Sequence, residues 1–144
     1  MNNKLIPIEI LLVEDNEDDI FLTQEAFKEN KLANKLNVVR TGTDALKYLR
    51  KQGEFSNCAT PNIILLDLNL PEVSGIDVLR QIKNDNMLKR IPVVILTTSS
   101  LERDIIESYD LHANCYMNKP VDLDSFLEII KIFGLFWFSI VTLP

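Results

Sequence analysis

The most constraining feature of this sequence is an uninterrupted apolar run that ends in a carboxylate, Asn62-Ile63-Ile64-Leu65-Leu66-Asp67. Turn-forming residues, Leu68-Asn69-Leu70-Pro71, follow it directly. A short run that is apolar at every position predicts a strand buried on both faces, as in a parallel sheet. A second run, Ile10–Val13, also ends in acids, at Glu14-Asp15. Because open α/β sheets bind ligands at the carboxyl ends of their strands, the two acidic ends predict one shared site.

Apolar runs and helical spacings alternate along the chain. The five runs are Ile8–Val13, Leu36–Val39, Ile63–Leu66, Pro92–Leu96 and Cys115–Met117. Five strand–helix repeats predict an α/β fold, a doubly wound five-stranded parallel sheet with five helices. Right-handed crossovers favour the flavodoxin-like strand order 2-1-3-4-5.

The expected helices follow the runs in turn. Apolar residues stand at helical spacing at Ile20 and Phe27, at Ala45, Leu46 and Leu49, at Val78, Leu79 and Ile82, at Leu101, Ile105 and Tyr109, and from Leu123 onward. The first helix is expected from Glu17 to about Glu29, where acids suit the helix N-terminus. Thr43, one of Ser99 and Ser100, and Asp122 are the expected caps of the second, fourth and fifth helices.

Size and charge exclude several classes of protein. A chain of 144 residues is expected to form one domain, 1–144, with a core of about 8–132 and an apolar tail of 133–144. The net charge of −6 argues against nucleic acid as a partner, because phosphate binding needs a basic face. No apolar stretch is long enough to span a membrane, and no secretory signal is visible. Two cysteines without metal-ligand spacing predict reduced thiols, and a cytoplasmic location is expected.

The residues at the predicted strand ends have the side chains that phosphoryl chemistry needs. Glu14, Asp15 and Asp67 would repel one another unless a cation joined them, and oxygen ligands of this kind suit Mg²⁺. Thr97 at the end of the fourth strand adds a hydroxyl, and Lys119 after the fifth adds a positive charge. Each residue alone is more often a turn former or a helix cap. Together, and each at its own strand end, they predict a site that binds and stabilises a phosphoryl group.

The same residues resemble a known family, the receiver domains of two-component response regulators, over roughly residues 8–132. The resemblance rests on four motifs: Leu11-Leu12-Val13-Glu14-Asp15; Asp67 with Pro71 and Gly75; Val94-Ile95-Leu96-Thr97-Thr98; and Tyr116-Met117-Asn118-Lys119-Pro120. One departure is Glu14, where the family most often has Asp, and altered Mg²⁺ affinity is the expected consequence.

The resemblance implies a role for each motif residue. Asp67 would accept a phosphoryl group from a phosphohistidine of a sensor kinase, so the protein would be a signalling phosphoacceptor and not an enzyme. Mg²⁺ would be held by Asp15 and Asp67, by Glu14 through water and by the backbone carbonyl of Asn69. The remaining roles fall on three positions: Thr97 and Lys119 would bind the phosphoryl oxygens, Tyr116 would turn inward with Thr97 as the switch, and the Lys119–Pro120 peptide would be cis.

The tail suggests a subfamily and a partner. From Leu123 onward, apolar residues would occupy nearly every face of a helix, whereas a helix packed on a sheet needs only one apolar face. The tail either folds back on its own core or, as we favour, exposes a patch that a second subunit buries, formed by Phe133, Phe136, Trp137 and Phe138. The ending Phe136–Pro144 and the segment Leu88–Ser99 are similar to those of cyanobacterial phytochrome-associated response regulators. That likeness implies a phytochrome-type kinase and a homodimer.

Three other interpretations were weighed. A phosphatase of the haloacid dehalogenase type needs a second Asp where this chain has Asn69. A flavodoxin binds phosphate in a loop of hydroxyls and amides, whereas Glu14-Asp15-Asn16 would repel it. A pseudo-receiver, a binding module that takes no phosphate, is disfavoured by the intact Asp67 and Lys119 but stays open as the alternative.

Overall fold

A computed structural model gives the fold and describes residues 7–28, 33–98, 101, 102, 104, 107 and 115–134. In chain order its elements are β1 (Ile8–Val13), α1 (Glu17–Phe27), β2 (Asn34–Val39), α2 (Gly42–Leu49), the 3₁₀ turn η1 (Gly53–Phe55), β3 (Ile63–Asp67), α3 (Gly75–Lys83), β4 (Val93–Thr97), β5 (Cys115–Asn118) and α5 (Leu123–Ile132). The fourth expected helix falls in a segment of which only Leu101, Glu102, Asp104 and Glu107 are described, and these four are helical. Its expected caps Ser99 and Ser100, and Ile105 and Tyr109, lie outside the described residues.

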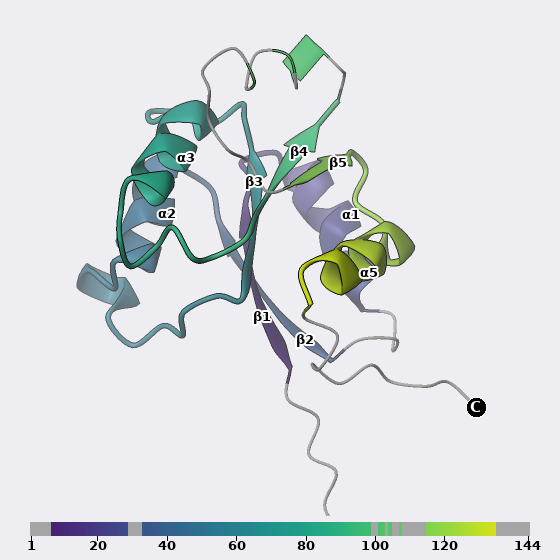
Figure 1. The fold of residues 1–144 in the computed structure, drawn as a ribbon, viewed down its shortest axis with the longest axis horizontal. Coiled ribbons are helices and arrows are strands. Elements are labelled where there is room, and N and C mark those ends of the chain that lie inside the picture. The colour runs from purple at the N-terminus through teal and green to yellow at the C-terminus, as the bar shows by residue number, and fades with distance from the viewer. Residues whose placement is uncertain are drawn as a thin grey trace, which may run out of the picture.

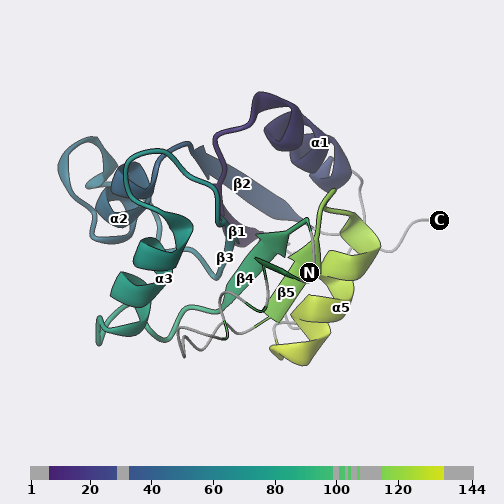
Figure 2. The same ribbon diagram turned by 90° about the horizontal axis from the view of Figure 1, so that it is seen from above.

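The five strands form one parallel sheet in the order β2-β1-β3-β4-β5, so the predicted fold class and strand order are confirmed. Helices cover both faces of this sheet (Figure 1): α2 and α3 lie on one side, and α1 and α5 on the other. Figure 2, seen from above, gives the same two layers with the sheet between them. All strands therefore end at the same edge.

The central strands are apolar at every position because each face packs on a separate core. Leu11 and Val13 of β1 belong to the cluster under α2 and α3, whereas Ile10 and Leu12 belong to the cluster under α1 and α5. In the second cluster the rings of Phe27 and Phe126 meet edge to face, with centroids 4.7 Å apart, and join α1 to α5. This double burial positions the strand ends rigidly.

The helix cap of α5 agrees with the prediction, whereas that of α2 differs. Asp122 caps α5 as expected, with its side chain accepting a hydrogen bond from the Ser125 N–H. The predicted cap Thr43 is wrong, because Thr41 takes that role and accepts from the Asp44 N–H. Thr41 has the extended backbone that a cap requires, whereas Thr43 already lies within the first turn.

The C-terminal helix ends two residues before a glycine. Gly134 has a φ of +69°, the left-handed conformation with which many helices end. Phe133 is half-buried and packs against the core under α1 and α5, while the preceding Ile132 is 72% exposed. The other members of the expected dimer patch, Phe136, Trp137 and Phe138, lie outside the described residues. Within the described ranges, no helix has the length and apolar character needed to cross a bilayer.

Candidate functional site

The carboxyl ends of β1 and β3 bring the three predicted acids together. Glu14 and Asp15 follow β1, Asp67 is the last residue of β3, and each offers an oxygen within 4.8 Å of the other two. Glu14 and Asp67 are buried, whereas Asp15 is exposed. These acids line an open cavity of about 620 Å³ together with Asn16, Glu17, Asp19, Asn69, Thr98 and Lys119. Every predicted metal-binding residue therefore lies on this one cavity.

The turn behind Asp67 depends on Gly75. The N–H of Gly75, the first residue of α3, donates to the Leu68 carbonyl at 3.1 Å, so the chain folds back against the end of β3. A Cβ on Gly75 would collide with the Asp67 carbonyl oxygen and with the Leu68 backbone. Only glycine permits this close approach, and the approach holds the backbone of Asp67 in place.

Lys119 connects three carboxylates. Its Nζ lies 2.8 Å from Glu14 Oε1 and 3.1 Å from Asp67 Oδ1. The third carboxylate is that of Asp19 on α1, 3.2 Å away, and this contact also has hydrogen-bond geometry. The Lys119 side chain is only 13% exposed, so its charge needs these partners. Lys119 thus lies beside Asp67, as the prediction of a phosphoryl site requires.

Burial and mutual contact shift the pKa values of this cluster. Burial, followed by the neighbouring Asp67, raises the pKa of Glu14 from 4.5 to about 7, against the opposing effect of Lys119. Burial would lower the pKa of Lys119, but Glu14 and Asp67 outweigh it and hold that pKa above 10.5. Lys119 therefore stays charged near neutral pH, while Glu14 holds a proton more readily than an ordinary glutamate does.

The donor set fits a hard divalent cation. Glu14 Oε1 is buried, and its close contact is the ion pair with the Lys119 ammonium at 2.8 Å, which Lys119 shares with two other carboxylates. A buried carboxylate whose charge is only partly compensated is costly, and a cation would reduce that cost. Three carboxylates on an open cavity supply the oxygen ligands that such a cation prefers.

The predicted switch residues are close to the site but hold other partners. The buried Thr97 hydroxyl donates to Asn118 Oδ1 on β5 at 3.4 Å, a long hydrogen bond. Tyr116 is half-buried against the core under α2 and α3. The Lys119–Pro120 peptide is cis in this structure.

Two residues near the site escaped the sequence analysis. Glu102 accepts hydrogen bonds from the Thr98 N–H and hydroxyl at 3.0 and 3.1 Å, and from Asn69 Nδ2 at 3.5 Å. Asp19 stands three residues after the helix cap Asn16, a position that predicts only a role at the helix N-terminus. Glu102 lies only four residues after Thr98, and the Ser99-x-x-Glu102 spacing of a capping box could have indicated it. The contact of Asp19 with Lys119 joins residues 100 positions apart, and no local pattern indicates it.

Fold and site together define the class of protein. The family of response regulator receiver domains matches residues 10–131, and the chain belongs to this family. It is accordingly a signalling phosphoacceptor and not a catalytic enzyme.

Within the family, the chain is similar to phytochrome response regulators, which confirms the resemblance expected from the ending Phe136–Pro144 and the segment Leu88–Ser99. The response regulator Rcp1 of Synechocystis sp. is 47% identical over 138 residues, 96% of this chain and 94% of that protein. The bacteriophytochrome response regulator AtBRR is 42% identical with a TM-score of 0.85, over 96% of this chain and 99% of that one.

Two further solved structures carry ligands or modifications. The phosphorylated cyanobacterial phytochrome response regulator RcpA is 49% identical with a TM-score of 0.75, over 96% of this chain and 99% of that one. The Mn²⁺-bound form of Rcp1 is 47% identical with a TM-score of 0.73, over the same shares. In this chain, Glu14, Asp15 and Asp67 offer the grouped carboxylate oxygens that could hold a metal ion.

Proposed function

We propose that this chain is a single-domain response regulator that accepts a phosphoryl group on Asp67 from a sensor histidine kinase. The observation that carries the proposal is the contact of the Asp67 carboxylate with Lys119 at 3.1 Å, inside the acidic group formed with Glu14 and Asp15. A nucleophile needs to be accessible and its product needs compensation of charge; the open cavity and Lys119 supply the two conditions.

The proposed reaction is a transfer between side chains. An Asp67 carboxylate oxygen attacks the phosphorus of the kinase's phosphohistidine, and the P–N bond breaks as the P–O bond forms. The histidine, already protonated on its other ring nitrogen, leaves as neutral imidazole. Mg²⁺, held by Asp15, Asp67, the Asn69 carbonyl and Glu14 through water, would neutralise charge on the phosphoryl oxygens. Lys119 binds one of those phosphoryl oxygens. The Thr97 hydroxyl gives up its hydrogen bond to Asn118 and donates to a second phosphoryl oxygen.

The negative charge of the phosphoryl group on Asp67 also drives the conformational change that transmits the signal. A phosphoryl group adds about −1.5 to −2 charges and strong acceptor oxygens, which favour the conformer with Thr97 and Lys119 closed on it. Tyr116 neighbours this site on β5 and follows Thr97 inward, so the surface around it changes. The likeness to RcpA and AtBRR supports a phytochrome-type kinase in light signalling. We place this relay in the cytoplasm.

A small phosphodonor tests the proposal without the kinase. The protein is incubated with Mg²⁺ and acetyl phosphate, and the mass of the intact chain is followed. We expect the addition of one phosphoryl group that requires Mg²⁺ and disappears in Asp67→Asn. Folded wild-type protein that stays unmodified would instead favour the pseudo-receiver, a binding module independent of phosphate.

We also infer that the whole chain acts as one domain and forms a homodimer through α5 and the tail 133–144. Support comes from the apolar tail sequence and from Ile132, whose side chain is 72% exposed beside Phe133 at the end of α5. Exposed apolar side chains in continuity with an apolar segment are typical of a surface that a partner buries.

A further inference from the structure

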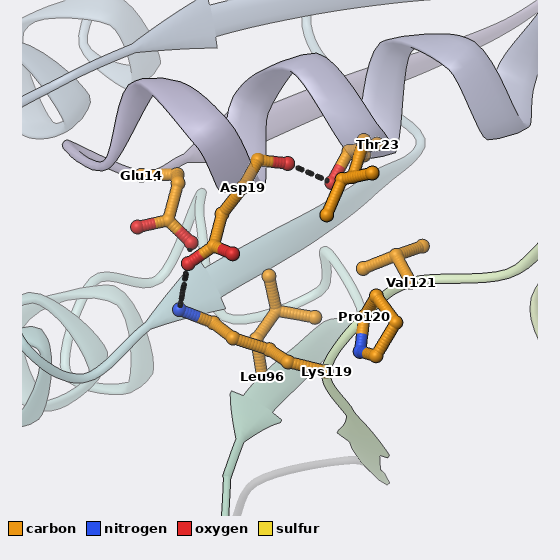
Figure 3. A pocket seen from close by; sticks show the side chains of 8 residues that line it. Glu14, Asp19, Thr23, Leu96, Lys119, Pro120 and Val121 are labelled. Carbon is orange, nitrogen blue, oxygen red and sulfur yellow. Dashed lines mark hydrogen bonds and ion pairs between the residues drawn. The ribbon is translucent and has the colours of Figure 1, made fainter.

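Asp19 is one of three carboxylates in contact with Lys119, and its role differs from the roles of Glu14 and Asp67. In Figure 3 its carboxylate descends from the first turn of α1 to the tip of the Lys119 side chain. Among the described residues, the acids grouped closely enough to hold a metal are Glu14, Asp15 and Asp67, and Asp19 stands outside that group. It is therefore the one carboxylate on Lys119 that neither binds the cation nor carries the phosphoryl group.

The position of Asp19 is fixed by its own helix. Its N–H donates to Asn16 Oδ1 at 3.0 Å, and its carbonyl accepts from the buried Thr23 hydroxyl at 2.8 Å. Asp19 and Lys119 line the narrow pocket between α1 and the segment after β5 (Figure 3), and they also face the open cavity. The 3.2 Å distance means that carboxylate and ammonium meet directly, at a place that the helix determines.

A cation bound by Glu14, Asp15 and Asp67 would change the electrostatic environment of the Lys119 ammonium. It would engage Glu14 and Asp67, the same carboxylates that now compensate the ammonium, and would add like charge beside it. Repulsion of this kind is strong where solvent is largely excluded, as around the 13%-exposed Lys119. Without another anchor, a long and flexible lysine side chain would turn away from the cation into solvent.

We propose that Asp19 is a positioning residue that holds the Lys119 ammonium beside Asp67 while a divalent cation occupies the acidic group. This inference rests on the proposed function, since it concerns how Lys119 is kept ready for the phosphoryl oxygens. The competing explanation is that Asp19 only stabilises the N-terminus of α1 as a first-turn acid. Asp18 separates the two explanations, because it is exposed, carries the same charge and lies in the same turn.

The experiment measures two binding steps in the purified protein. Titration with Mg²⁺ gives the affinity for the cation, and beryllofluoride, a mimic of the phosphoryl group, is then titrated at saturating Mg²⁺. We expect Asp19→Asn and Asp18→Asn to have Mg²⁺ affinities within about twofold of each other, since both remove one nearby charge. Only Asp19→Asn should weaken beryllofluoride binding, by about fivefold, the size of effect that loss of one partly exposed ion pair produces.

A spectroscopic signature accompanies the change in affinity. In the ¹⁹F spectrum of bound beryllofluoride, the fluorine next to the Lys119 ammonium should shift in Asp19→Asn and keep its position in Asp18→Asn. Asp19→Ser, which retains a short oxygen-bearing side chain in the first turn, serves as the second variant and should behave as Asp19→Asn does.

Each contrary outcome has a defined meaning. Equal beryllofluoride affinities and spectra in Asp19→Asn and Asp18→Asn would overturn the positioning role. So would a loss in Asp19→Asn that is equally large for Mg²⁺ and for beryllofluoride, because that pattern reports damage to the local structure. Wild-type protein that binds no beryllofluoride, or Asp67→Asn that binds it equally well, would overturn the proposed function itself.

Discussion

Glu14 Oε1 lies 2.8 Å from Lys119 Nζ, yet the pKa of Glu14 is raised to about 7 rather than lowered. Burial is the main cause, and the next is the Asp67 carboxylate, which accepts a hydrogen bond from the protonated form of Glu14. Lys119 shares its charge among three carboxylates, so it compensates Glu14 only in part. The folded protein therefore stores an unfavourable charge at Glu14 near neutral pH, which a bound cation would relieve.

The first prediction concerns stability against pH without divalent cations. A raised pKa means that the folded state binds the proton more tightly than the unfolded state does, so the stabilisation is complete below about pH 4.5 and is lost as pH rises through about 7. Relative to Glu14→Gln, the wild type should lose up to about 3 kcal/mol of unfolding free energy across this window. Urea unfolding of both proteins in EDTA measures the difference. Parallel curves from pH 5 to 8 would contradict the prediction.

The second prediction concerns the cation. Mg²⁺ binds the folded acidic group and not the dispersed acids of the unfolded chain, so it should raise the free energy of unfolding by about 1.4 kcal/mol at ten times its dissociation constant. Thermal unfolding with Mg²⁺ and with EDTA measures the gain. Asp15→Asn should lose it, because Asp15 is one of the three grouped acids. The half-buried Asp85→Asn, just beyond the C-terminal end of α3 and outside the grouped acids, is the control and should keep it.

The third prediction contrasts two glycines. Gly75→Ala should cost about 1–3 kcal/mol, because the added Cβ collides with the Asp67 carbonyl and the Leu68 backbone. It should also slow phosphorylation by acetyl phosphate, since the collision displaces Asp67. Gly134→Ala should cost about 1 kcal/mol through its positive φ alone, with open space around it. If both variants were phosphorylated at the wild-type rate, the role of Gly75 in placing Asp67 would be wrong.

These predictions rest on contacts that differ in how far the sequence could reveal them. Asp67, Asp15 and Lys119 were predictable because strand periodicity and turn chemistry determine which residues end a strand, and parallel strands end together. The cap of α2 was misassigned because Thr41 and Thr43 have equal intrinsic preference, and the helix begins at Gly42, directly after Thr41. Asp19 was missed because its contact joins α1 to the segment after β5, and no local pattern encodes a pairing across that distance in sequence.

The last prediction concerns the proposed homodimer. Trp137→Ala should shift the protein toward the monomer in sedimentation or gel filtration, because aromatic side chains dominate the energy of buried interfaces. Ile132→Ala should act in the same direction, since this side chain is 72% exposed at the end of α5. Met87→Ala is the matched control: it removes an 82%-exposed apolar side chain that follows α3 in the sequence, and should leave the dimer intact. A dimeric wild type whose dissociation constant is the same in all three variants would exclude the tail and α5 from the interface.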